Sequence, residues 1–333
     1  IAAYGKSARN GLTLLENEVN DSGGINGKKI EFVYGDDENK PASAVNVGQK
    51  LINDDKVVGI VGPLTSTCAN SLAPVAQQNK TPMVTGTGTN PKITQAGDFI
   101  YRTCFIDPFQ GTVIAKFAES DLKAKTAAVL YDNGNDYSKG LAEYFQKAFK
   151  GKIVESETYN TGDQDFNAQL TKIKATNPDV ILLPDYYSTV GMIAKQARAQ
   201  GIKATFLGGD GWDSADLFKV GGDSANGAYF SDHYSADDTS SQVVKFVKDY
   251  KKKYGTVPDS MAALNYDAGK VLVQSIKKAG KTDPEAIKAA LKNYSGTVVS
   301  GKITFDKNRN AIKAAVIINA KDNKFVFVKK VQP

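Results

Sequence analysis

The chain has 333 residues, more than one hydrophobic core usually holds, so we expect two domains. With 41% hydrophobic and 23% charged residues it has the composition of a globular protein, and no apolar run approaches the ~18 residues that a membrane-spanning helix needs. The net charge of +6 comes from lysines scattered beside acidic residues and not from clustered arginines, which excludes a nucleic-acid-binding surface.

The first hundred residues alternate short apolar segments with amphipathic ones. Leucines and a valine recur at helical spacing from residue 12 to 19, and the Asn20–Gly24 segment ends that helix. The pattern then predicts strands at 30–34, 57–61, 82–84 and 99–101, with helices at 42–52 and 70–78. Strands that alternate with helices form a parallel sheet with helices on both faces, so we expect an α/β fold.

A second block repeats this plan after the turn-like residues 107–111, where we expect the chain to cross between domains. It has predicted strands at 126–131, 180–183 and 205–207, and predicted helices at 139–149 and 190–200. After residue 234 the pattern predicts helices at about 241–253, 261–279 and 284–292. The chain ends in predicted strands at 302–305, 315–318 and 325–328, of which the last two form a hairpin.

The residues that most often carry catalysis are few and isolated. Cys68 and Cys104 lie too far apart in sequence for a C-x-x-C motif, which leaves a disulfide and two buried thiols equally open. His233 is the only histidine, so a catalytic triad or a zinc site has little to build on, and we interpret it as a loop or hinge residue. Gly5-Lys6-Ser7 resembles the end of a phosphate-binding P-loop. We expect no catalytic residue, no metal ligand and no cofactor.

Ligands of open α/β sheets bind beyond the carboxyl ends of the strands, so the residues after each strand form the candidate site. After 57–61 come Gly62 to Thr67, whose hydroxyl residues either cap the next helix or leave its N–H groups to bind an anion. After 82–84 come Thr85 to Pro91, small residues that let a polar ligand approach closely. Their Gly86-x-Gly88 lacks the third glycine of a dinucleotide-binding loop.

The strands of the second block are followed by different residues. Segments 132–137, 184–187 and 208–212 supply tyrosines, the only tryptophan and a carboxylate flanked by glycines. A ligand with both a carboxylate and an ammonium group suits this combination, its anion facing Ser66 and its cation facing Asp210. Taken singly, these residues also have structural interpretations, the tyrosines in the core and Asp210 in a turn.

The chain contains, in order, the stretches YGKSARNG, GGINGKKIEFVYGDDENKPASAV, GPLTSTCANSLAPVAQQNKTPMVTGTGTNPKIT, YRTCFIDPFQG, VLYDNGNDYSKGLAEYF, GDQDFNAQLTKIK and FLGGDGW. Together they resemble the type I periplasmic binding proteins, specifically the leucine/isoleucine/valine-binding group of ABC amino-acid importers, over essentially the whole length. The resemblance implies two Rossmann-like α/β lobes with parallel-rich sheets, hinged by crossovers, with a ligand cleft between them. The lobes would be residues 1–106 with 234–314, and residues 107–233 with 315–333.

The resemblance also implies roles for single residues. Ser66, the carbonyl of Thr87, and Thr89 would hold the α-carboxylate and ammonium ends of an amino acid. Asp210 would pair with the ammonium. Residues near the ligand side chain or the cleft wall would be Tyr4, Leu64, Thr65, Tyr137, Tyr186, Trp212 and Met261. Tyr4-Gly5 would be the loop after a first strand and Lys6-Ser7 the start of a helix, so Gly5-Lys6-Ser7 would be no P-loop.

This sequence departs from the family pattern at its start and at two site positions. The strand and Gly/Thr-rich loop that family members have ahead of Tyr4 are missing, which suggests a trimmed chain. Asp210 is one methylene shorter than a glutamate, and Trp212 is bulky where a small residue is common. Both differences bear on which ligand side chain is accepted.

The resemblance implies capture of a neutral, branched-chain aliphatic α-amino acid by hinge closure, and its delivery to an ABC permease in the membrane. The protein would be an exported monomer without enzymatic activity, periplasmic or a cell-surface lipoprotein, with a signal segment outside this chain. Alternative ligands are an aromatic or small amino acid, an amide or an aromatic acid, and the same fold can serve as a ligand-sensing receptor domain. A cytosolic α/β enzyme would need a nucleotide fingerprint, a catalytic base or metal ligands, and we find none in the sequence.

Overall fold

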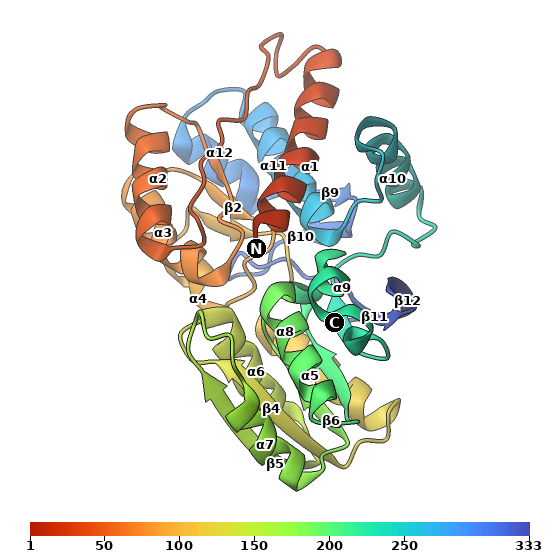
Figure 1. Cartoon of the computed structure of the whole chain (residues 1–333). Helices are drawn as coiled ribbons and strands as arrows, with labels where there is room; N and C mark the ends of the chain where they lie inside the picture. The colour runs from red at the N-terminus through yellow and green to blue at the C-terminus, as the bar shows by residue number, and fades with distance from the viewer. The chain divides into compact units, whose positions relative to one another are not determined.

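The computed structural model describes residues 1–333 and divides the chain into two compact units. Unit 1 consists of Ile1, residues 106–237 and residues 314–333, and unit 2 consists of residues 2–105 and 238–313. Figure 1 traces the chain through both units by colour. Each unit combines segments that are far apart in sequence.

A seven-stranded sheet forms the centre of unit 1, in the order β12-β11-β8-β7-β6-β4-β5. The central strands are apolar runs with both faces buried, as a parallel sheet covered by helices requires. The parallel strands are β4 (Thr126–Asp132), β5 (Lys152–Tyr159), β6 (Val180–Leu182), β7 (Thr205–Gly208) and β8 (Tyr229–Asp232). An antiparallel hairpin completes the sheet, with β11 (Ala315–Lys321) next to β8 and β12 (Lys324–Val331) at the edge.

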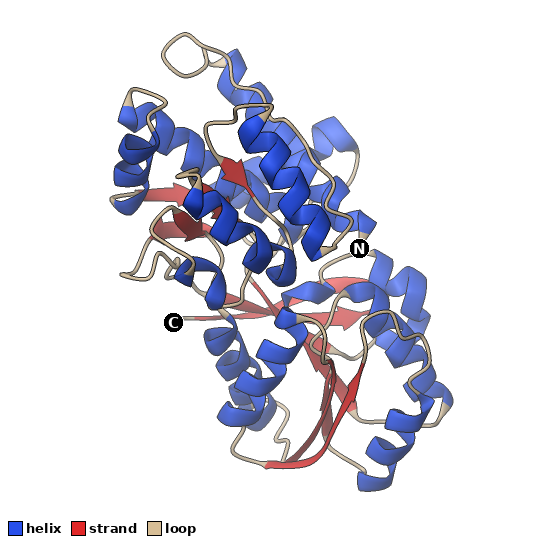
Figure 2. Cartoon of the chain, turned by 90° about the vertical axis from the view of Figure 1, so that its left-hand side faces the viewer, coloured by secondary structure: helices blue, strands red, loops and turns tan.

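Helices cover both faces of this sheet (Figure 2). Asn135 caps one of them, α6, by accepting hydrogen bonds from the N–H groups of Tyr137 and Ser138. The cap fixes where α6 begins and therefore where Tyr137 lies. The helices of unit 1 are α5 (Asp107–Ser120), α6 (Asp136–Ala148), α7 (Asn167–Thr176), α8 (Tyr187–Ala199) and α9 (Asp216–Gly221), with the 3₁₀ helices η1 (Asp210–Trp212) and η2 (Gly222–Ala225).

Unit 2 contains a smaller parallel sheet of β1 (Ile60–Val61), β2 (Met83–Thr85) and β3 (Ile100–Arg102), in that order. An antiparallel hairpin of β9 (Ser295–Val298) and β10 (Gly301–Thr304) forms a separate two-stranded sheet. The helices of unit 2 are α1 (Ala2–Asp21), α2 (Pro41–Asn53), α3 (Ser66–Gln78), α4 (Lys92–Gln95), α10 (Ser241–Tyr254), α11 (Ser260–Ala279) and α12 (Pro284–Lys292). Across both units, no helix combines the length and the apolar character that crossing a membrane would require.

Strand β2 divides the core of unit 2 into two clusters. Successive residues of a strand point to opposite faces, so Met83 packs with Leu72 of α3, while its neighbour Val84 packs with Leu272 of α11. Burying one such side chain contributes about 1.5–3 kcal/mol. The two clusters hold the carboxyl ends of β1 and β2, and the loops that follow them, in a fixed place.

The structure confirms the predicted α/β architecture and the closing hairpin, in which Lys321 pairs with Lys324. The strand predicted at 30–34 is wrong, because that segment pairs with no other strand. Its N–H groups at Ile30 and Phe32 donate instead to side chains of α1. The strand predicted at 57–61 is reduced to the two residues of β1, and the strands β5 and β9 were not predicted. Residues 107–111, expected as a turn, form the start of helix α5.

The start of the chain also differs from the expectation. Helix α1 already begins at Ala2, so Tyr4-Gly5 lies inside a helix and not in a loop. Two alanines, the best helix formers, precede Tyr4 and favour this early start. Ser7 lies in the same helix and donates a hydrogen bond to the carboxylate of Asp259 at 2.6 Å, so Gly5-Lys6-Ser7 does not form a P-loop.

Candidate ligand-binding site

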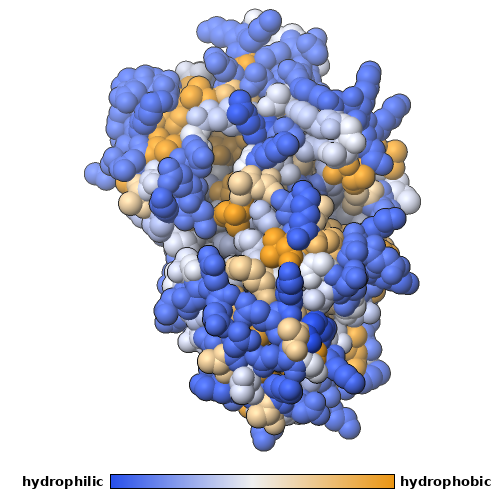
Figure 3. Space-filling model, in the orientation of Figure 1, coloured by the Kyte–Doolittle hydropathy of each residue, from blue (hydrophilic) through white to orange (hydrophobic).

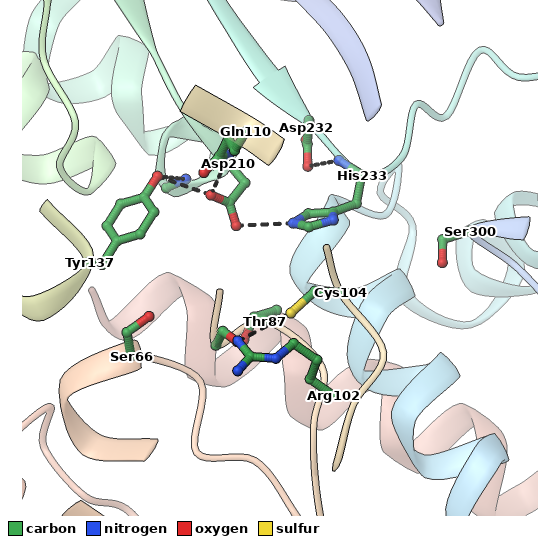
Figure 4. A network of polar contacts seen from close by, with 12 residues as sticks. Ser66, Thr87, Arg102, Cys104, Gln110, Tyr137, Asp210, Asp232, His233 and Ser300 are labelled. Atoms are coloured by element: carbon green, nitrogen blue, oxygen red, sulfur yellow. Dashed lines mark hydrogen bonds and ion pairs between the residues drawn. The ribbon is translucent and has the colours of Figure 1, made fainter. Parts of the chain in front are cut away.

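A buried carboxylate, that of Asp210, lies just beyond the carboxyl end of β7 in unit 1 and is only 3% exposed. Its Oδ1 accepts hydrogen bonds from Gln110 Nε2 at 2.8 Å and from the Tyr137 hydroxyl at 3.0 Å. Its Oδ2 lies 3.2 Å from Nε2 of His233 (Figure 4). Burying a charge is unfavourable unless it is paired, and these contacts offset the desolvation cost of the Asp210 carboxylate.

Glycines at the end of β7 allow this close packing. A Cβ on Gly209 would lie 2.6 Å from the hydroxyl of Tyr137, and one on Gly208 would lie 2.0 Å from the indole of Trp212. Larger residues would push apart the side chains that surround Asp210. The glycines that precede Asp210 in the sequence therefore have a packing role.

Tyr137 connects three parts of this site. Its hydroxyl accepts a hydrogen bond from the N–H of Gly211 at 3.0 Å while donating to Asp210, and its ring stacks on Tyr186 with centroids 5.3 Å apart. Burial raises the pKa of Tyr137 well above its ordinary value, and the nearby Asp210 adds to this, so the hydroxyl stays protonated. Unit 1 thus brings together Tyr137, Tyr186 and Asp210, as the sequence suggested.

Trp212 lies in the core of unit 1. It is 1% exposed, its Nε1 donates to the carbonyl of Leu183 at 2.9 Å, and its ring contacts that of Phe230. The indole therefore fastens η1 to the end of β6, directly behind Asp210 in sequence. Replacing Trp212 would remove this packing and this hydrogen bond, and would therefore shift η1 and Asp210.

Gln110 and His233 were not predicted as site residues. His233 does lie in the bend after β8, but its ring is buried and contacts Asp210, so the interpretation as a simple loop residue is incomplete. The sequence could have indicated His233, because it follows the end of a strand just as Asp210 does. Gln110 gave no such signal, since it lies in the first turn of α5.

Two further buried carboxyls, Asp213 and Asp232, lie near Asp210. Burial raises the pKa of Asp232 well above its ordinary value, and Asp213 and Asp210 add to this effect. The N–H of His233 donates to Asp232 at 2.6 Å. The group does not have the arrangement of a metal site, and neither does any other set of His, Cys, Asp and Glu side chains in the chain.

In unit 2 the predicted hydroxyl residues surround the start of α3. Thr65 is the N-cap residue, but its hydroxyl donates to Asn39 at 2.8 Å and makes no capping bond to the helix. Ser66 is buried, and its hydroxyl accepts a hydrogen bond from the N–H of Asn90 at 3.2 Å. Ser66 and Thr67 are already the first two residues of α3, so the alternative that they simply cap their own helix is wrong. The partial positive charge of the helix start lacks a side-chain acceptor from its N-cap residue, Thr65.

The loop after β2 is tied to the loop after β1. The hydroxyl of Thr87 donates to the carbonyl of Leu64 at 2.6 Å, and that of Thr85 donates to the carbonyl of Pro63 at 2.9 Å. Thr89 is 1% exposed, and its hydroxyl makes no hydrogen bond within the chain. A buried hydroxyl without a partner is unusual and points to a role in binding.

A fully buried arginine holds this loop from the other side. The guanidinium of Arg102 donates to the carbonyls of Gly88 at 2.7 Å and Pro91 at 3.3 Å. Cys104 also donates to the carbonyl of Gly88, and both cysteines are buried thiols that form no disulfide. Arg102 was not predicted as a site residue, because nothing in the sequence around it shows that it faces the loop.

Tyr4 and Met261 are buried in α1 and α11, two helices that pack along each other. A Cβ on Gly11 of α1 would lie 2.2 Å from the carbonyl oxygen of Ala262, so glycine permits this close approach. A cavity of about 880 Å³ opens beside these helices, where Figure 3 shows apolar surface around a hollow. Of the predicted site residues only Leu64 lines it, so this cavity is distinct from the hydroxyl cluster.

Comparison with known proteins places these features in context. Residues 1–324 match the model of a family described as periplasmic binding protein. Among curated proteins, the Leu/Ile/Val-binding protein BraC3 of Rhizobium johnstonii is 33% identical over 311 residues, which cover 92% of this chain and 84% of that protein.

Two solved structures are similar over the whole of this chain. The leucine-binding protein LivK from Thermotoga maritima has a TM-score of 0.95 and 36% identity, with 95% of its own chain covered. The branched-chain amino acid transporter substrate-binding protein LivJ from Streptococcus pneumoniae, solved in complex with isoleucine, has a TM-score of 0.95 and 33% identity, with 96% covered.

Proposed function

The chain belongs to the periplasmic binding protein family, and on this premise we propose that it captures a neutral, branched-chain aliphatic α-amino acid for an ABC importer. The family and the fold predicted from the sequence are confirmed. The observation that carries the proposal is the buried carboxylate of Asp210 at a strand end, oriented by neutral donors.

The ammonium group of the ligand is assigned to Asp210. A carboxylate has about four acceptor positions, of which Oδ1 uses two for Gln110 and Tyr137 and Oδ2 uses one for His233. Capacity therefore remains for an ammonium, and a charge-assisted hydrogen bond of this kind contributes roughly 1.5–3 kcal/mol. The rings of Tyr137 and Tyr186 supply apolar surface for an aliphatic side chain.

The α-carboxylate is assigned to the residues of unit 2 around the start of α3. The helix start, the hydroxyl of Ser66 and the unpartnered hydroxyl of Thr89 are donors suited to an anion. The hydrogen bond from the hydroxyl of Thr87 to the carbonyl of Leu64 joins the two loops and holds these donors in place before a ligand binds. We propose that one ligand engages both sets of side chains, and that capture is coupled to closure because only the closed form makes both.

The relatives are solute-binding proteins and not enzymes, and their family implies an extracytoplasmic location. We infer that this protein acts as a monomer outside the cytoplasmic membrane, after export by a signal segment, and passes its ligand to a membrane permease. The same proposal includes the alternative that a lipid anchors the exported protein to the membrane. The branched-chain preference follows from the relatives, whose names include leucine, isoleucine and valine.

Calorimetric titration of refolded, ligand-stripped protein tests the proposal. Leucine, isoleucine, valine, alanine, phenylalanine and threonine are added in turn, because such a protein can purify with ligand already bound. Micromolar or tighter binding of the branched aliphatic amino acids, with weaker binding of the others, is the expected result. Absence of heat with every α-amino acid would reject it and would favour a ligand without an ammonium group, such as an aromatic acid.

A further inference from the structure

Asp210 has one ion-pair partner in the structure, and that partner is the only histidine of the chain. The side chain of His233 is fully buried, and its Nε2 lies 3.2 Å from Asp210 Oδ2. We propose that His233 is a positioning residue that links amino-acid binding to proton release: its imidazolium neutralises Asp210 in the free protein, and the ammonium of the ligand replaces it there. This inference rests on the proposed function, because it requires an ammonium group at Asp210.

The two oxygens of Asp210 have different partners. Oδ1 accepts from Gln110 and Tyr137, which are neutral donors, whereas Oδ2 contacts His233 (Figure 4). An ammonium that pairs with Asp210 therefore approaches Oδ2 and comes close to the imidazole ring. Two cations at such a distance repel each other strongly in a poorly solvated site, and a neutral imidazole removes that repulsion.

Other titratable groups face this pair from each neighbouring element. Asp213, which follows η1, and Asp232 in β8 lie near Asp210, and Asp107 of α5 lies near Tyr137 of α6. The raised pKa of Asp232 favours its protonated form, so it does not replace Asp210 as the counter-ion of the ring. The raised pKa of Tyr137 keeps its hydroxyl neutral. Asp210 is the carboxyl whose oxygen contacts the ring of His233, at 3.2 Å, so an ammonium that binds Asp210 changes the charge next to the ring.

The direction of the pH effect follows from linkage. An ammonium at Asp210 disfavours the imidazolium, so the ring of His233 should titrate at a lower pH in the complex than in the free protein. Ligand affinity then falls as the pH drops through the titration midpoint of the free protein, by at most a factor of about ten per pH unit. Well above that midpoint the ring is neutral in both states, and the affinity should not change with pH.

A single histidine makes the test direct, because the NMR signals of its ring overlap with no other imidazole. On saturation with leucine, the titration midpoint of His233 should move down by about one pH unit. In parallel, the leucine affinity should fall roughly tenfold between pH 8 and pH 5. An unchanged midpoint would overturn the proposal.

Two variants separate this role from a structural one. His233→Gln keeps an amide donor opposite Asp210 but does not titrate, so the ratio of its leucine affinities at pH 8 and pH 5 should approach one. Asp232→Asn changes a neighbouring carboxyl, leaves the pair with Asp210 in place, and should keep the pH dependence. A wild-type ratio in His233→Gln would reject the role of His233 and leave the proposed function standing. Absence of amino-acid binding at every pH would reject both.

Discussion

The hydroxyl of Tyr137 donates to Asp210 Oδ1 at 3.0 Å and, at the same distance, accepts the N–H of Gly211. One side chain thus fixes both the carboxylate of Asp210 and the backbone that follows it. The orientation of the carboxylate is set before any ligand binds, which lowers the entropy that binding must offset. This relationship gives the site its most direct test by substitution.

Tyr137→Phe should weaken leucine binding by roughly tenfold, because the carboxylate loses a donor and Gly211 loses its acceptor. Fluorescence of the only tryptophan, Trp212, offers a convenient binding signal close to Asp210. Tyr144→Phe, on the same helix, is the matched control and should bind normally. Equal affinities for both variants would contradict the role of Tyr137.

Asp210→Asn should weaken binding by about tenfold or more, because an amide cannot form a charge-assisted bond with the ammonium. Asp210→Ala should be at least as weak. Calorimetry with leucine measures both affinities, and circular dichroism checks that the variants fold. Near-normal affinity in a folded Asp210→Asn protein would show that the ammonium is held elsewhere.

Ser66→Ala and Thr89→Val each remove one hydroxyl from the proposed carboxylate site. Each should reduce the leucine affinity by a factor of about five to ten, in line with a hydrogen bond of about 1 kcal/mol or more. Ser71→Ala is the control, since that hydroxyl lies on the same helix α3 but donates to the carbonyl of Thr67. If Ser71→Ala weakened binding as much, the loss would reflect helix stability and not a contact with the ligand.

Asp185 should make unit 1 less stable at high pH. Burial raises the pKa of Asp185 to about 7. The folded protein therefore keeps a proton that the unfolded chain loses near pH 4, and the stability from this group is lost as the pH rises toward 7. Asp185→Asn keeps the neutral form, so between pH 5 and pH 8 urea unfolding should show wild type losing stability relative to the variant, by at most ~3 kcal/mol.

Asp179 provides a control of opposite sign for that experiment. It accepts from the N–H groups of Lys125 and Thr126, and these hydrogen bonds lower its pKa. The stability from Asp179 is present at neutral pH and is lost as the pH falls into the acid range. Asp179→Asn should therefore change stability at neutral pH but leave the change between pH 5 and pH 8 as in wild type. A wild-type profile in Asp185→Asn would contradict the account of Asp185.

The part of the site that the sequence predicted depends on one rule of parallel sheets. Ser66 and Asp210 both follow strands whose apolar runs are visible in the sequence, so the rule that ligands bind at strand ends was enough to find them. His233 lies in the same kind of place, but its partner is distant in sequence. Only the pairing of β7 with β8, which aligns Gly208 with Phe230, brings Asp210 and His233 to one edge.

The errors in the fold prediction have a related cause. Residues 30–34 have an apolar pattern suited to a strand, but strand formation depends on a neighbour that local sequence does not specify. In the structure, Asn20 and Glu16 of α1 take the hydrogen bonds of that segment. Arg102 and Gln110 were missed for the same reason, because their importance comes from contacts with distant parts of the chain.

The most direct test of the central claim compares leucine with its two halves. Ligand-stripped protein is titrated calorimetrically with L-leucine, with 4-methylpentanoate, which lacks the ammonium, and with 3-methylbutylamine, which lacks the carboxylate. We predict that leucine binds and that each analogue binds roughly 10- to 100-fold more weakly, as the loss of one charge-assisted contact implies. If 4-methylpentanoate bound as tightly as leucine, the pairing of an ammonium with Asp210 would be contradicted.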